Sequence, residues 1–140
     1  GAKQGGAASV GLNICLPFEQ HFNPYIDSDK NITFDYFFVR KTIFMRYAQG
    51  FIALPGGFVT LDELSEAITL IQTNKMVDFP VVLVGRKYWQ GLIDWFRNTM
   101  LVNHMIKEED LEIFNIVDTA DEAVKIITNF YKKYAIKPNF

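Results

Sequence analysis

Short apolar segments alternate along this chain with segments of helical periodicity, and that alternation constrains the fold more than any other feature. Five short apolar segments are typical of strands: residues 9–16, 32–38, 51–54, 81–84 and 112–117. Four others repeat apolar residues every three or four positions, as amphipathic helices do: 39–47, 61–71, 89–100 and 121–134. Buried strands that alternate with helices predict a mostly parallel sheet covered on both faces. The predicted fold class is therefore α/β and doubly wound.

Length and composition exclude several classes of protein. A chain of 140 residues is about one domain long, and no linker, repeat or low-complexity stretch divides it, so residues 1–140 are predicted to form one domain. A hydrophobic content of 49% with a net charge of −2 argues against disorder. Acidic residues outnumber basic ones 16 to 14, which argues against a nucleic-acid partner. No apolar run approaches the roughly 20 residues of a membrane span, so no membrane partner is predicted.

The cysteine and histidine content is low. One cysteine, Cys15, excludes an internal disulfide framework and fits a reducing compartment such as the cytoplasm. Its position inside an apolar segment predicts a buried side chain. His21 and His104 are far apart in the sequence, so no metal site is expected, and no cofactor is implied.

A glycine pair follows the third predicted strand and opens a helix. In parallel sheets, ligands bind beyond the carboxyl ends of the strands. Gly56 and Gly57, after Pro55, allow the backbone to turn tightly and to approach a ligand closely. The N-terminus of the next helix offers N–H groups and a positive dipole end, which together favour an anion such as phosphate.

The same segment has a purely structural interpretation. Thr60, followed three residues later by Glu63, matches a capping box, in which the threonine caps the helix and the glutamate bonds back to its N–H. Pro55 and the two glycines are equally compatible with an ordinary turn. From these residues alone, both interpretations stay open.

Residues 53–64 carry a family resemblance. They read A-L-P-G-G-F-V-T-L-D-E-L and closely resemble the P-G-G-x-G-T-x-x-E signature of the LOG (Lonely Guy) family. The pair Arg40 and Lys41 is similar to the family's second hallmark, in the preceding helix. These are Rossmann-like proteins that act as cytokinin riboside 5′-monophosphate phosphoribohydrolases. Many relatives carry an older "lysine decarboxylase-like" label, but no lysine here lies in a recognisable pyridoxal phosphate context.

The resemblance implies an activity and a set of site residues. The family hydrolyses the N-glycosidic bond of a nucleoside 5′-monophosphate, such as AMP or a cytokinin riboside monophosphate, to a free base and ribose 5-phosphate. Glu63 matches the carboxylate that stabilises positive charge on the ribose, and Arg40 matches the catalytic cation. The nucleotide- and phosphate-binding positions implied are Lys41, Pro55, Gly56, Gly57, Phe58 and Thr60. A homodimer is implied as well.

Two departures from the family pattern leave other functions open. Val59 stands where the family has glycine, and a β-branched residue would deform the turn if that position required a positive φ. The family's S-G-G-G-P-G-x-M segment is not present before Gly1, which predicts the later part of a Rossmann-like domain without its first strand or strands and helix. The alternatives to a phosphoribohydrolase are a non-catalytic nucleotide-binding or carrier module and a dimer-forming scaffold. Glu19 and His21 are candidates for the base pocket or for a surface loop.

Overall fold

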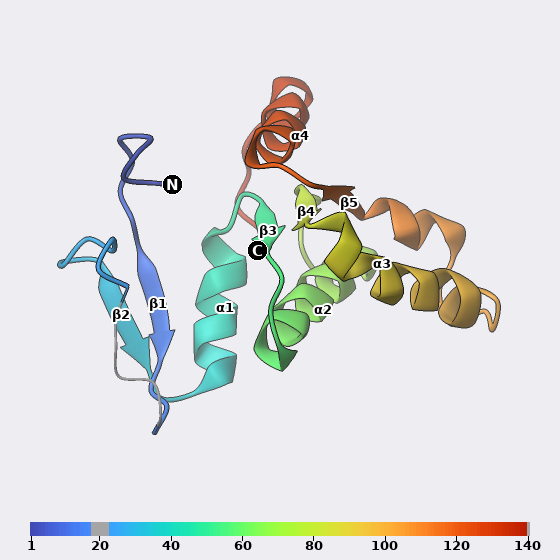
Figure 1. The fold of residues 1–140 in the computed structure, drawn as a ribbon, viewed down its shortest axis with the longest axis horizontal. Coiled ribbons are helices and arrows are strands. Elements are labelled where there is room, and N and C mark those ends of the chain that lie inside the picture. Colours follow the sequence, from blue (N-terminus) through green and yellow to red (C-terminus); the bar gives the residue numbers. More distant parts are fainter. Residues whose placement is uncertain (18–22, 140) are drawn as a thin grey trace. The chain divides into compact units, whose positions relative to one another are not determined.

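The computed structural model describes residues 1–17 and 23–139. It consists of two compact units, Gly1–Arg46 and Tyr47–Phe140. The first unit contains two parallel strands, β1 (Gly11–Ile14) and β2 (Asn31–Phe34), with Gly11 opposite Asn31 and Ile14 opposite Phe34. Helix α1 (Phe37–Tyr47) follows β2 (Figure 1).

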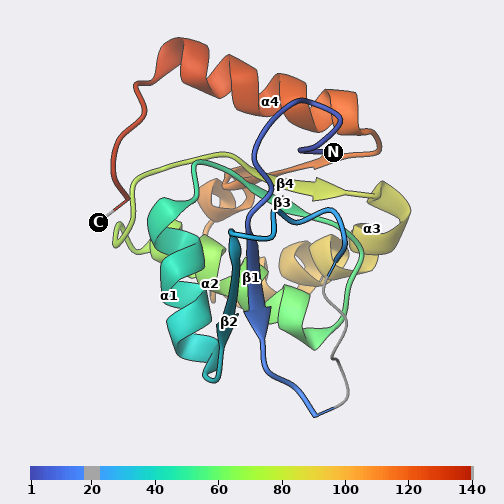
Figure 2. The ribbon, with the colours of Figure 1, turned by 90° about the vertical axis from the view of Figure 1, so that its left-hand side faces the viewer.

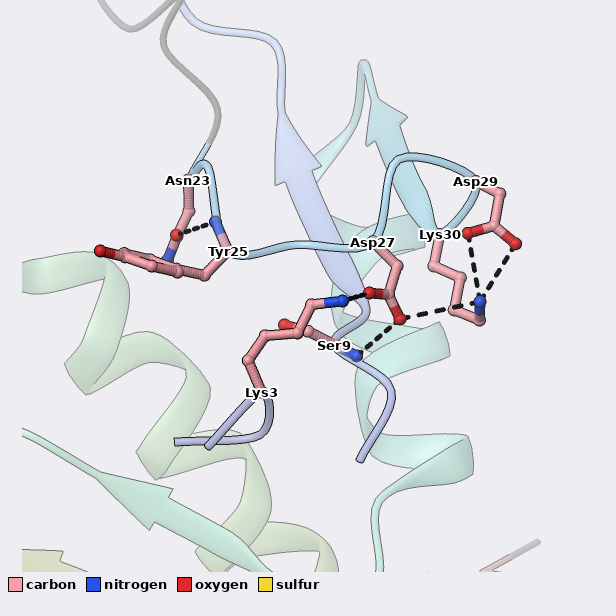
Figure 3. A network of polar contacts seen from close by, with 7 residues as sticks. All are labelled: Lys3, Ser9, Asn23, Tyr25, Asp27, Asp29 and Lys30. Carbon is pink, nitrogen blue, oxygen red and sulfur yellow. Dashed lines mark hydrogen bonds and ion pairs between the residues drawn. The ribbon is translucent and has the colours of Figure 1, made fainter. Parts of the chain in front are cut away.

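A polar network joins the segments that lead into the two strands of the first unit (Figure 3). The Asp27 carboxylate accepts a hydrogen bond from the Ser9 N–H at 3.0 Å, and the Asp27 N–H donates to the Ser9 carbonyl at 2.9 Å. Lys3 and Lys30 form ion pairs with the same carboxylate. Lys30 also donates to the exposed Asp29 carboxylate, and this hydrogen bond lowers the pKa of Asp29 below its ordinary value. The network therefore holds the chain before β1 against the chain before β2.

The second unit is a three-stranded parallel sheet with helices on both faces. Its strands are β3 (Phe51–Ala53), β4 (Val81–Val84) and β5 (Phe114–Val117), in the order β3-β4-β5. Its helical elements are α2 (Phe58–Gln72), α3 (Arg86–Trp95), the π-helical η1 (Phe96–Leu101), the 3-10 helix η2 (Glu108–Glu112) and α4 (Ala120–Lys133). Figures 1 and 2 show α4 over one face of this sheet and α2 and α3 over the other.

The core of the second unit is centred on β4. Val81, Val82 and Leu83 are completely buried. Val82 packs with Val117 of β5 and Ala123 of α4. Because side chains alternate along a strand, Val81 and Leu83 point to the other face, which α2 and α3 cover. Burial of each such side chain stabilises the fold by about 1.5–3 kcal/mol, so the apolar run 81–84 fixes the middle of the sheet.

The predicted α/β class, with parallel strands alternating with helices, is confirmed. The second predicted strand is too long, because β2 ends at Phe34 and α1 begins at Phe37. Tyr36, Phe37 and Phe38 are all exposed, so their alternation does not reflect one buried sheet face. The prediction of a buried Cys15 is wrong, since this thiol is exposed.

Candidate active site

The turn between β3 and α2 leads into a helix N-terminus whose cap residue is a glycine. Gly57 occupies the N-cap position in an extended conformation, with φ −88° and ψ −155°. The first intrahelical bond runs from the Leu61 N–H to the Gly57 carbonyl, at 3.1 Å. Because the cap residue is a glycine, it supplies no side-chain hydrogen bond to this helix end. The N–H groups of Phe58, Val59 and Thr60 and the positive end of a 15-residue helix thus favour an anion at this turn.

The capping-box interpretation of this segment is wrong. Because α2 begins at Phe58, Thr60 is the third residue of the helix and not its cap. The apolar periodicity from Leu61 onward marks the buried part of the helix and misses the first turn, where Phe58 is 91% exposed and Val59 is 43% exposed. Glu63 lies in the second turn of α2. Thr60 and Glu63 share one face of the helix because they are three residues apart.

The two glycines of the turn have different steric roles. A Cβ atom at Gly56 would lie 2.9 Å from the Cβ of Thr60 and 3.2 Å from its Cγ2. The side chain of Thr60 therefore packs against the turn where only a hydrogen atom fits. A Cβ atom at Gly57 would meet nothing within 4 Å of the described chain. Gly56 is thus required for packing, whereas Gly57 leaves open space beside the helix N-terminus.

The neighbouring turn, between β4 and α3, supports this glycine turn. Gly85 has φ +100°, and a Cβ atom there would lie 3.4 Å from Cγ of Pro55. The Gly85 N–H donates to the Val117 carbonyl at 2.8 Å, which fixes it at the carboxyl end of the sheet. The hydroxyl of Tyr88, in the first turn of α3, donates to the Gly56 carbonyl. The two turns therefore form one contiguous surface beyond the carboxyl ends of β3 and β4.

Val59 does not strain the backbone. It is the second residue of α2, and the non-glycine residues with positive φ in the described chain are Asn74 and His104. The expected deformation of the turn is therefore absent. Val59 and Glu63 are four residues apart and lie next to each other on the helix, so the valine side chain occupies space beside the carboxylate that glycine would leave open.

Arg40 and Lys41 belong to the first unit, within α1. The Nε–H of Arg40 donates to the Leu12 carbonyl of β1 at 2.7 Å, and the guanidinium lies 5.9 Å from the centre of the Phe44 ring. Arg40 is therefore anchored to β1 and is not merely a solvated helix residue. Pro55, Gly56, Gly57, Phe58 and Thr60, by contrast, come together in one turn of the second unit, with Glu63 one helical turn further on.

Sequence reasoning missed Tyr88. The carboxyl end of β4 is an obvious place to search, because Gly85 directly follows the predicted strand 81–84. Glu19 and His21 lie outside the described residues. The described part of the chain has no group of three or more His, Cys, Asp or Glu side chains that could hold a metal ion. Nor does it contain a helix with the length and apolar character needed to cross a membrane.

The fold and this turn define a parallel α/β protein with a glycine turn and a helix N-terminus at the carboxyl edge of its sheet. A family model described as "Possible lysine decarboxylase" matches residues 1–127. The chain belongs to this family, which is the LOG family that residues 53–64 resemble.

Curated relatives carry more specific names. A cytokinin riboside 5′-monophosphate phosphoribohydrolase of Mycobacterium tuberculosis is 33% identical over 102 residues, which cover 71% of this chain and 52% of the relative. A protein of the same name from Arabidopsis thaliana is 35% identical over 92 residues, 65% of this chain and 42% of the relative. A bifunctional cytokinin biosynthesis protein of Fusarium pseudograminearum is 35% identical over 79 residues, 56% of this chain and 16% of the relative. The chain thus spans about half the length, or less, of these relatives.

Proposed function

We propose that the protein containing this chain is a nucleoside 5′-monophosphate phosphoribohydrolase. It would hydrolyse the N-glycosidic bond of AMP or of a cytokinin riboside monophosphate to the free base and ribose 5-phosphate. The observation that carries the proposal is the N-terminus of α2 with a glycine as its cap residue, placed after Pro55 and Gly56 at the carboxyl end of β3, with Glu63 one turn further along the same helix. Two relatives named as phosphoribohydrolases of this kind support it.

The geometry of α2 suits a phosphate and a ribose placed in succession. In the proposed complex the phosphate accepts hydrogen bonds from the first-turn N–H groups and from the Thr60 hydroxyl. The five steps from Phe58 to Glu63 rise about 7.5 Å along a helix, which is comparable with the reach from a 5′-phosphate to C1′ across a ribose. Because Thr60 and Glu63 share a helix face, a nucleotide bound at the turn would place its ribose beside the Glu63 carboxylate.

Each charged residue then has a distinct task. Cleavage of the glycosidic bond builds positive charge on the ribose ring, which the Glu63 carboxylate stabilises while it positions or activates water. The family resemblance assigns to Arg40 the task of orienting the phosphate or ribose, or of bonding the departing base. Lys41 adds positive charge for the phosphate.

The test is product release by the full-length protein. Incubation with AMP should give adenine and ribose 5-phosphate in equal amounts, measured by chromatography. Glu63→Gln should lower the rate by about 10²–10⁴-fold, the usual contribution of a general acid or base. Asp62→Asn is the matched control, because Asp62 is exposed, carries the same charge and faces another side of α2; its rate should stay within about twofold of wild type. Equal rates in Glu63→Gln and wild type would refute the role of Glu63.

One observation favours a second candidate, a nucleotide-binding or carrier module without catalysis. Val59, in place of the family's glycine, lies beside Glu63 on α2 and narrows the space that a ribose would need. AMP would then raise the melting temperature without being cleaved. In that case Val59→Gly should restore hydrolysis, even though glycine inside a helix costs about 0.5–1 kcal/mol of stability. A variant that binds AMP and still cleaves nothing would show that Val59 is not the obstacle.

A homodimer and a cytoplasmic location are parts of the same proposal. The dimer is implied by membership of the family, and light scattering on the full-length protein measures it directly. A single cysteine in the sequence is in keeping with a reducing compartment.

A further inference from the structure

Tyr88 is held in a defined position beside the glycine turn. It lies in the first turn of α3, and its ring packs edge-on against the Trp89 ring, with the two ring centres 4.9 Å apart. Trp89 is 1% exposed, and its indole N–H donates to the Val84 carbonyl at 3.1 Å. The Tyr88 ring thus rests on a buried side chain that is itself bonded to β4, and its hydroxyl reaches the Gly56 carbonyl.

This hydrogen bond determines how the peptide between Gly56 and Gly57 is oriented. In a planar trans peptide, the C=O and N–H groups point in opposite directions. With the Gly56 oxygen bound to Tyr88, the Gly57 N–H must point away from Tyr88. A rotation of this peptide by about half a turn would exchange the two groups and put a carbonyl oxygen where the N–H had been.

Glycine makes such a rotation easy, because it adopts conformations closed to other residues. On the side where a side chain would project, the described residues leave open space at Gly57, since an added Cβ would meet nothing within 4 Å. The rotation would be harmful to anion binding, because an N–H attracts an anion and a carbonyl oxygen repels it. Anion binding therefore requires a contact that holds the Gly56–Gly57 peptide in one orientation. The hydrogen bond from the Tyr88 hydroxyl to the Gly56 carbonyl is such a contact.

We propose that Tyr88 is a positioning residue of the phosphate site: its hydroxyl holds the Gly56–Gly57 peptide with the Gly57 N–H available to the phosphate group of the nucleotide. This inference rests on the proposed function for the nature of the ligand. Tyr88 acts on phosphate affinity through the peptide and takes no part in the cleavage step. Loss of one neutral hydrogen bond corresponds to about a fivefold change in an equilibrium constant.

The test compares AMP with adenosine, which lacks the phosphate, by titration calorimetry on the full-length protein. Tyr88→Phe should weaken AMP binding about fivefold and leave adenosine binding unchanged. If the protein is a hydrolase, KM for AMP should rise by the same factor while kcat stays constant, as expected for a contact equal in ground and transition states. The binding measurement stands whether or not AMP is cleaved, so failure of the hydrolase proposal does not decide the outcome for Tyr88.

Tyr131→Phe is the matched control. The Tyr131 hydroxyl also donates to a backbone carbonyl, that of Gln49, at 2.6 Å, but Gln49 precedes β3 whereas Gly56 follows it. This variant loses an equivalent bond at the opposite end of the strand and should bind AMP as wild type does. The inference is overturned if Tyr88→Phe binds AMP like wild type, if it loses AMP and adenosine affinity equally, or if wild type does not distinguish the two ligands.

Discussion

The steric contrast between Gly56 and Gly57 predicts opposite outcomes for one substitution at adjacent positions. In Gly56→Ala the new methyl group would lie 2.9 Å from Cβ and 3.2 Å from Cγ2 of Thr60, and closer still to its Oγ1. Carbon atoms in good contact are about 3.5–4.0 Å apart, so the turn or the first turn of α2 must shift. Overpacking of this kind costs about 1–3 kcal/mol, and we expect that loss in the free energy of unfolding.

Gly57→Ala is the matched control for this loss. Its new methyl group meets nothing within 4 Å, and φ −88° is accessible to alanine. Alanine is a poorer N-cap than glycine but reduces the entropy of the unfolded chain, and these effects offset to within about 0.5 kcal/mol. Urea unfolding, monitored by tryptophan fluorescence, gives the free energy of unfolding of both variants. Trp89 is a suitable probe because it is buried and packs against Tyr88, which is bonded to this turn.

A second substitution tests the cause of the loss. Thr60→Ala removes Oγ1 and Cγ2 but keeps Cβ, so it should recover part of the stability lost in Gly56→Ala. The expected coupling between the two sites is at least about 0.5 kcal/mol, as for residues in direct contact. Equal destabilisation by Gly56→Ala and Gly57→Ala, or perfectly additive effects of Gly56→Ala and Thr60→Ala, would refute the steric reasoning.

Three further predictions concern the supports of the second unit. Gly85→Ala should cost about 1–2 kcal/mol in urea unfolding, because φ +100° is unfavourable for alanine and the methyl group approaches Pro55. Thr119→Ala should lower the free energy of unfolding by about 1 kcal/mol, because the Thr119 hydroxyl accepts a hydrogen bond from the Glu122 N–H and caps α4. Thr119→Ser keeps a hydroxyl at this position and should retain most of that stability. The Glu122 pKa lies below its ordinary value of 4.5, chiefly because the carboxylate accepts a hydrogen bond from the Asp118 N–H. The ionised Glu122 carboxylate therefore stabilises the fold above pH 4.5, and this contribution is lost as the pH falls through the lowered pKa. The difference in free energy of unfolding between wild type and Glu122→Gln should thus shrink below pH 4.5.

The sequence predicts the five strands and the four α-helices of the described chain, but it misplaces the ends of elements that meet at exposed residues. The run 81–84 identifies β4 because the strand is covered on both faces, which leaves no polar position to interrupt it. The start of α2 is missed because Phe58 and Val59 are helical yet exposed, so they add nothing to the apolar period. The long second strand fails for a related reason, since Phe37 and Phe38 begin a helix on exposed positions.

The candidate site likewise has residues that the sequence predicts and one that it does not. Pro55, Gly56 and Gly57 are found from sequence because strand, turn and helix are contiguous along the chain. The support from Tyr88 joins residues 32 positions apart and depends on how β3 and β4 align in the sheet, which no local pattern reports. The capping box could be excluded only from the position of the first helical residue, Phe58, because a sequence pattern locates helix ends to within one or two residues.

The central position of β4 determines which backbone amides exchange with solvent most slowly. Its neighbours β3 and β5 pair with both of its edges, and its side chains are enclosed by helices on both faces. Exposure of the β4 amides to deuterium therefore requires the unit to open as a whole, whereas the first turn of α2 can open alone. Deuterium uptake by β4 thus reports the global stability of the unit, and uptake at Phe58–Thr60 reports the local order of the turn. A nucleotide that binds at this turn would slow exchange there first.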